Sequence, residues 1–170
     1  MGSEVLPAPV RFVVTGFSVF SGVDANPTEE LIRSLPGWLE QRGRALPGGA
    51  KVVTCTTLRV SVKDVDAWLA EEAQRIQADP DSGPVIWVHF GVDVRAQQIR
   101  LEVQAANETN FRCPDADGWQ PSCEPICSEG PPSLTSHLPL DRLLGALQAG
   151  GHNVVLSTDA GEDEHVPSYP

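Results

Sequence analysis

Strand-like and helix-like patterns alternate over the first ninety residues, and this alternation constrains the fold more than any other feature. Short apolar runs at residues 11–15, 52–60 and 85–88 have the pattern of buried strands. Between them, residues 26–35 and 61–78 carry apolar side chains at helical spacing. Strands that alternate with helices in this way predict an α/β domain with a largely parallel sheet.

The first predicted helix has a clear start signal. Asn26 suits the N-cap, Pro27 the first helical position, and Glu29 is placed for a capping box. The pair Pro36-Gly37 is predicted to end or break this helix. A loop with a glycine at each end, residues 16–22, leads from the first strand into the helix.

The second half of the chain also begins with a strand pattern. Apolar and polar residues alternate over 98–104, which places Glu102 on the opposite face from Leu101 near the end of a buried strand. Residues 120–136 have the composition of a loop, residues 140–147 that of a helix closed by glycines, and residues 153–157 that of a last strand. No internal repeat or second domain is indicated.

The chain is acidic, with 12 basic and 23 acidic residues and a net charge of −11. No basic stripe is present, so nucleic acid and anionic membranes are not expected as partners. No apolar run approaches the roughly 20 residues that a bilayer requires, and the first ten residues lack the features of a signal peptide. A cytoplasmic protein is therefore predicted.

Four cysteines raise the question of a metal site. Cys55 lies in a valine-rich strand and is interpreted as a core residue, whereas Cys113, Cys123 and Cys127 form a C-x9-C-x3-C cluster. This spacing is not a recognised zinc pattern and no histidine lies nearby, so unpaired thiols are favoured over zinc. His89, in the third predicted strand, is interpreted as a hydrogen-bonded core residue.

Two groups of motifs give the chain a family resemblance. The matching residues are Thr15, Gly16, Phe17, Phe20, Asn26 and Pro27 in the first loop, and Gly91, Leu101-Glu102, Asn110-Phe111-Arg112, Pro114-Asp115 and Gly118 further on. With them the chain resembles the pyroglutamyl-peptidase I family, the cysteine peptidases that remove N-terminal pyroglutamate. The stretches with Ala-x-Asn-Glu and Phe-Arg-Cys-Pro-Asp are most similar to its plant-like members.

The resemblance implies a fold and a set of site residues. The fold would be a three-layer α/β/α sandwich with a mostly parallel mixed sheet. Phe17 and Phe20 would pack on the pyrrolidone ring and Asn26 would bind the substrate backbone; the alternative is that both Phe are core residues and Asn26 only caps its helix. Glu102 would orient the catalytic histidine and Arg112 would stabilise the oxyanion. No cofactor and no metal are implied.

The sequence departs from the family near its end. The family continues from Ser-x-Asp-Ala-Gly to its cysteine nucleophile, whereas here the matching residues 157–161 are followed by an acidic segment and no Cys occurs after Cys127. We therefore expect an incomplete domain over residues 1–161, truncated at its C-terminus, and a divergent acidic tail over 162–170. His165 echoes the family's catalytic histidine, although a solvated tail is favoured.

Three functions remain open at this stage. The family acts on N-terminal pyroglutamyl peptides by thiol catalysis, and this chain is expected to be inactive because the nucleophile is absent. It could instead be a non-catalytic binding or regulatory partner of full-length subunits, or a non-functional splice or gene-model product. Homo-oligomerisation is left open. Uncovered apolar surface is expected to make the chain prone to aggregation.

Overall fold

The computed structural model describes residues 8–20, 22–41, 46–79, 83–111, 113–158 and 160. They form two compact units. The first contains the described residues up to Val92 together with Asp115–Asp117, and the second contains Asp93–Pro114 and the described residues from Gly118 onward. Among the described residues, no helix is long and apolar enough to cross a bilayer.

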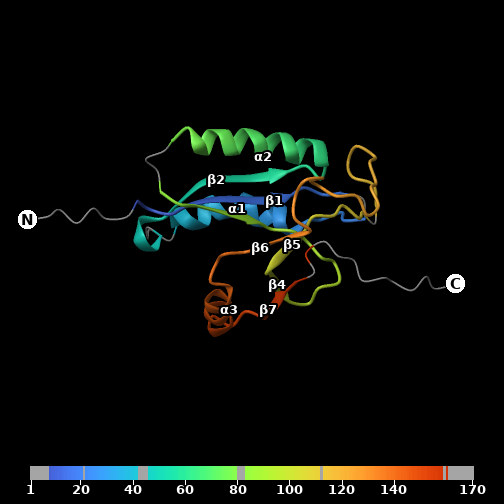
Figure 1. Cartoon of the computed structure of the whole chain (residues 1–170). Coiled ribbons are helices and arrows are strands. Elements are labelled where there is room, and N and C mark those ends of the chain that lie inside the picture. The colour runs from blue at the N-terminus through green and yellow to red at the C-terminus, as the bar shows by residue number, and fades with distance from the viewer. Residues whose placement is uncertain are drawn as a thin grey trace, which may run out of the picture. The chain divides into compact units, whose positions relative to one another are not determined.

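A three-stranded parallel sheet forms the centre of the first unit (Figure 1). β1 (Arg11–Phe17) lies between β2 (Lys51–Leu58) and β3 (Val85–His89). Both pairings are parallel, as the alternation of strands and helices predicts. Val13 and Val14 in the middle of β1 are 0% and 5% exposed, so the central strand supplies the core of this unit.

Helices cover both faces of this sheet. α1 (Pro27–Gln41) and α2 (Val62–Gln77) contact neighbouring residues of β2. Thr54 donates a hydrogen bond to Glu72 of α2, whereas the Cys55 thiol donates to the Ile32 carbonyl of α1 at 3.5 Å. Because successive strand residues point to opposite faces, the two helices lie on opposite sides of the sheet. The helix–sheet–helix layering expected of the fold is present in this unit.

The prediction that α1 ends or breaks at Pro36 is wrong. The helix continues to Gln41 with Pro36 inside it. Proline has no backbone N–H, so the carbonyl of Ile32, four residues earlier, loses its helical donor. The Cys55 thiol supplies a replacement donor to that carbonyl. A tertiary contact therefore offsets part of the cost of the proline.

α2 forms almost as predicted. It begins after its N-cap Ser61, whose side chain accepts a hydrogen bond from the Asp64 amide at 3.2 Å, and ends at Gln77. Its inward face includes the expected apolar residues, but also the buried carboxylate of Glu72, which the Arg75 guanidinium contacts at 2.7 Å. A short 3₁₀ turn, η1 (Pro47–Gly49), precedes β2.

The second unit contains two small sheets rather than an extension of one mixed sheet. β4 (Ile99–Glu102) pairs in parallel with β7 (Val154–Ser157), and β5 (Gln104–Ala106) pairs antiparallel with β6 (Ser133–Thr135). β6 lies within the stretch predicted to be loop. It is only three residues long and depends on a distant partner, so no local pattern marks it.

The single helix found in the described part of the second unit is α3 (Leu140–Ala149). It ends at Gly150 and is followed by Gly151 at φ 86°, a left-handed conformation that favours glycine. The predicted glycine stop is thereby confirmed. Val154 of β7 is 2% exposed, but Ile99 of β4 and Leu134 of β6 are 52% and 67% exposed. The strand around Glu102 is therefore not buried, contrary to the prediction.

Candidate functional site

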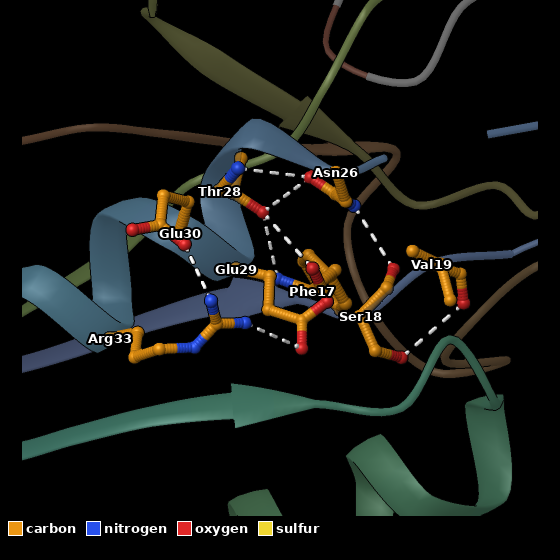
Figure 2. Close-up of polar contacts among 8 residues, drawn as sticks. All are labelled: Phe17, Ser18, Val19, Asn26, Thr28, Glu29, Glu30 and Arg33. Carbon is orange, nitrogen blue, oxygen red and sulfur yellow. Dashed lines mark hydrogen bonds and ion pairs between the residues drawn. The ribbon is translucent and has the colours of Figure 1, made fainter. Parts of the chain in front are cut away.

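The loop that follows β1 is held by the start of α1. The Phe17 amide donates to Thr28 Oγ1 at 2.9 Å, and Thr28 Oγ1 lies 2.8 Å from Asn26 Oδ1 (Figure 2). Gly16 permits this closeness, because a Cβ added there would lie 2.7 Å from the Thr28 carbonyl oxygen. The end of β1 is thus held against α1 by the close approach of Gly16 to the Thr28 backbone and by the Thr28 hydroxyl.

Asn26 connects the helix start to the loop. Its Oδ1 accepts from the Thr28 amide at 3.0 Å, which is the predicted N-cap interaction, and its Nδ2 donates to the Ser18 carbonyl at 3.1 Å (Figure 2). The residue is 5% exposed. The predicted capping box does not form: the Glu29 carboxylate lies 3.3 Å from an Arg33 guanidinium nitrogen, one turn along the helix.

The two aromatic residues assigned to the site are accessible. Phe17 ends β1 and Phe20 forms an antiparallel bridge with Val23, with the Val23 amide 2.9 Å from the Phe20 carbonyl. Both Phe side chains are half-buried rather than enclosed in the core. The structure therefore places Phe17, Phe20 and Asn26 on one continuous loop and helix start.

His89 adds a polar group at the same edge of the sheet. It ends β3, and its Nδ1 lies 2.7 Å from Thr15 Oγ1 of β1. The predicted hydrogen bond is present, but His89 is exposed at the strand end and is not a core residue. Partial burial of the imidazole lowers the pKa of His89 below its ordinary 6.5. Ligands of parallel α/β sheets bind outside the carboxyl ends of the strands.

The other two assigned residues lie elsewhere. Glu102 is the last residue of β4, is exposed, and pairs in register with Ser157 of β7 in the second unit. Arg112 lies outside the described residues, as do Asp159 and the acidic tail with His165. The proposed roles of Glu102 and Arg112 therefore stay predictions.

The sequence did not predict the contacts that Asp115 and Asp117 make with the start of α2. Asp115 Oδ2 accepts from the Val62 amide at 3.1 Å, and Asp117 Oδ2 accepts from the Ser61 hydroxyl at 2.6 Å. Two carboxylates thus lie at the positive N-terminus of α2. The Ser61 hydrogen bond and the Arg59 guanidinium hold the pKa of Asp117 below its usual 3.8. In the sequence, Pro114-Asp115 stands out only as a match to the family motif.

The cysteines give no metal centre in the described part of the chain, where no cluster of three or more His, Cys, Asp or Glu could hold an ion. Cys55 is half-buried, and its burial raises the pKa of the thiol. Cys123 and Cys127 are exposed thiols on the long loop before β6. The loop is fixed instead by Asn107, whose side chain exchanges two hydrogen bonds of 2.8 Å with the Cys127 backbone.

Three known proteins similar to this chain are all named pyrrolidone-carboxylate peptidases. A pyrrolidone-carboxylate peptidase from Pyrococcus furiosus is 30% identical over 159 residues, covering 89% of this chain and 66% of the relative. One from Vibrio parahaemolyticus is 33% identical over 152 residues, covering 89% and 65%. This chain therefore spans less than two thirds of the length of either relative, and 64% of a similar peptidase from Alkaliphilus oremlandii.

Solved structures agree with the sequence matches. A crystal structure of a mutant pyrrolidone carboxyl peptidase from P. furiosus has a TM-score of 0.73 at 28% identity, covering 89% of this chain and 66% of that chain. Structures of that protein and its cysteine-free mutant give a TM-score of 0.74. A family model described as pyroglutamyl peptidase matches residues 10–164. The chain thus belongs to the pyroglutamyl peptidase family, a family of cysteine-type hydrolases.

Proposed function

We propose that this chain binds the N-terminal pyroglutamyl residue of peptides at the carboxyl end of β1. In a complete family member this binding would serve thiol-dependent removal of pyroglutamate. The observation that carries the proposal is the pair of half-buried aromatic residues, Phe17 and Phe20, on a loop fixed by Asn26 and Thr28. The names of the similar proteins, which are pyrrolidone-carboxylate peptidases, support the same substrate.

The chemistry of the ligand suits these side chains. A pyrrolidone ring is flat and apolar on its faces but polar along its edge, so aromatic side chains can pack on it while polar groups bind its rim. Asn26 is nearly buried, and the Ser18 carbonyl takes one of its two amide hydrogens. We assign the second hydrogen to the backbone of the bound peptide. The N-cap role and the binding role are then carried by different atoms of one side chain.

Catalysis needs groups that residues 1–170 do not all supply. We assign the orientation of a catalytic histidine to Glu102 and stabilisation of the oxyanion to Arg112, by their match to the family motifs. The 170 residues contain no cysteine beyond Cys127. A cysteine peptidase needs a thiolate beside a base, so we propose that the 170-residue polypeptide binds pyroglutamyl peptides without cleaving them. Resemblance to plant-like members remains part of this proposal.

A second candidate function is a non-catalytic partner of full-length subunits. It is favoured by the exposed apolar side chains of the second unit, including Ile99 at 52% and Leu134 at 67% exposure. Exposed apolar surface of this kind marks interaction sites or aggregation liabilities. Mixing the chain with a full-length family enzyme tests this function: co-elution supports it, and separate elution rejects it.

Calorimetric titration with a pyroglutamyl dipeptide amide tests the binding proposal. Phe17→Leu should weaken binding about two- to tenfold, because an aromatic contact of this kind contributes about 0.5–1.5 kcal/mol beyond simple area. Phe12→Leu is the matched control, since Phe12 lies at the opposite end of the same strand. Equal affinities of the two variants would contradict the assigned site. A pyroglutamyl-aminomethylcoumarin assay should show no turnover, and thiol-dependent turnover that disappears in Cys113→Ala would contradict the inactive form.

A further inference from the structure

His89 has one ring nitrogen whose role nothing described so far explains. Its Nδ1 lies 2.7 Å from Thr15 Oγ1, and the two residues are direct partners in the β1–β3 register. On its other side the imidazole stacks near Trp87, with ring centroids 6.2 Å apart and planes inclined by 25°. The ring is therefore fixed in position, although the residue itself is exposed at the strand end.

The hydrogen bond to Thr15 decides which nitrogen carries the proton. Thr15 is 0% exposed, and in the part of the chain that the structure describes its hydroxyl has His89 Nδ1 as its sole partner. A buried O–H that donates to nothing costs free energy, so the hydroxyl donates and Nδ1 accepts. The neutral imidazole then has its proton on Nε2. Partial burial lowers the pKa of His89, which favours this neutral form near pH 7.

His89 lies beside the assigned ring-binding region, and with Nδ1 turned to Thr15 its Nε2–H group faces away from that hydroxyl. A Cβ added to Gly16 would contact α1, so the side chains of Thr15 and Phe17 project from the opposite face of β1. Phe17 lies two residues beyond Thr15, a rise of about 6.6 Å along the strand. His89, beside Thr15, is thus a diagonal neighbour of Phe17 at the carboxyl edge of the sheet. Among the described residues, Nε2 has no hydrogen-bond partner.

We propose that His89 Nε2–H donates a hydrogen bond to the lactam carbonyl of a pyroglutamyl ring packed on Phe17, and that His89 is thereby a specificity-determining residue. This inference rests on the proposed binding function and adds a residue that the family motifs do not include. A site built to hydrogen-bond one group of its ligand discriminates against analogues that lack it. The lactam carbonyl is the feature that separates this ring from a plain five-membered ring.

A comparison of two ligands on the 170-residue polypeptide isolates the His89 contribution. The probes are a pyroglutamyl dipeptide amide and its cyclopentanecarbonyl analogue, which keeps a neutral ring of the same size without the lactam. The wild-type chain should prefer the pyroglutamyl ligand at least tenfold. His89→Phe keeps an aromatic ring beside Trp87 and should lose most of that preference while still binding the analogue. His89→Gln places an amide donor near the Nε2 position and should retain most of it.

Imidazole nitrogen NMR gives a second measurement that needs no ligand. The neutral ring should show the proton on Nε2, and Thr15→Val should remove that tautomer preference. An Nδ1–H tautomer in the wild-type chain would overturn the inference, as would an undiminished ligand preference in a folded His89→Phe variant. An undiminished preference in His89→Phe would reject the role of His89 but leave the proposed pyroglutamyl binding intact. A wild-type chain that binds neither ligand would instead reject the proposed function, and the inference with it.

Discussion

The two compact units of this chain differ in how well they bury their apolar residues. In the first unit, Val13, Val14, Val23, Ile32 and Leu58 are all less than 9% exposed, whereas Val154 is the one hydrophobic residue of the described second unit buried to that degree. The first unit has helices on both faces of a three-stranded sheet, and the second has two-stranded sheets. Isolated two-stranded pairs are marginal in water. The loop proposed to bind substrate therefore stands on the better-packed unit.

The two units also differ in what their buried polar side chains hold in place. Glu72 is 7% exposed and accepts hydrogen bonds from Thr54 and Arg75, while Asn26 and Thr28 bond to each other and to the end of β1. A satisfied polar network of this kind fixes one arrangement of the chain. In the second unit the matching example is Thr109, whose hydroxyl donates to the Glu124 carbonyl at 2.9 Å and holds a loop instead of a core.

The largest effect is expected where β1 approaches α1. Gly16→Ala would place a Cβ 2.7 Å from the Thr28 carbonyl oxygen and 2.8 Å from Ile32 Cγ1, so strand and helix must separate. The free energy of unfolding of the first unit should fall by about 1–3 kcal/mol. Gly37 lies in α1, and a Cβ added there would have no neighbouring atom within 4 Å. Gly37→Ala should therefore raise the free energy of unfolding by about 0.5–1 kcal/mol. Chemical denaturation measures both, and equal stabilities would contradict the close packing of the first unit.

Removal of the buried carboxylate should have the next largest effect. In Glu72→Ala the half-exposed Arg75 regains water, but Thr54 loses its acceptor, so the expected loss of stability is about 1–2 kcal/mol. The Arg75 hydrogen bonds, assisted by Thr54, hold the pKa of Glu72 below its ordinary 4.5. This stabilisation is therefore complete above pH 4.5 and is lost as the pH falls through the lower folded-state value.

Denaturation at pH 7 and at progressively lower pH checks this prediction. Glu71→Ala is the matched control, because Glu71 is the exposed neighbour on the same helix. The difference in the free energy of unfolding between Glu72→Ala and Glu71→Ala should become smaller below pH 4.5. A gap that is constant down to pH 2 would show that Glu72 contributes packing alone.

Helix capping provides the smallest effect and compares the two units directly. Asn26→Ala removes the side-chain cap of α1 and should lower the free energy of unfolding by about 1 kcal/mol. In α3 the N-cap position is Pro139, which makes no side-chain cap hydrogen bond, so Pro139→Asp should raise stability by about 0.5–1 kcal/mol. Urea melts followed by circular dichroism give both values. A loss of stability in Pro139→Asp would show that Pro139 has a role beyond the cap.

Local signals in the sequence predicted most of the first unit. Ser61 and Asn26 mark helix starts through their own side chains, and the apolar runs of β1, β2 and β3 need no distant information. Pro36 was misjudged because the thiol that compensates it is contributed by Cys55, nineteen residues later in the sequence. The burial of Glu72 has no local signal in the sequence, because its half-buried partner Thr54 lies on another element.

The candidate site was predictable only in part. Phe17, Phe20 and Asn26 lie in one short motif, so the sequence places them together, and the structure keeps them on one loop and helix start. His89 was missed because its relation to Thr15 arises from the strand register, which a single sequence does not reveal. The contacts of Asp115 and Asp117 with the start of α2 are likewise set by residues more than fifty positions away.

Hydrogen exchange with and without a pyroglutamyl dipeptide amide tests the central claim most directly. That claim is that the first unit is the stable base of a pyroglutamyl-binding loop. Without ligand, the amides of β1 should exchange more slowly than those of β4 and β7, because stable cores protect their hydrogen bonds best. Ligand should add protection at residues 16–23 and 85–90 and leave 99–106 unchanged. Ligand-induced protection confined to 99–106, or slower exchange in β4 and β7 than in β1, would contradict the account.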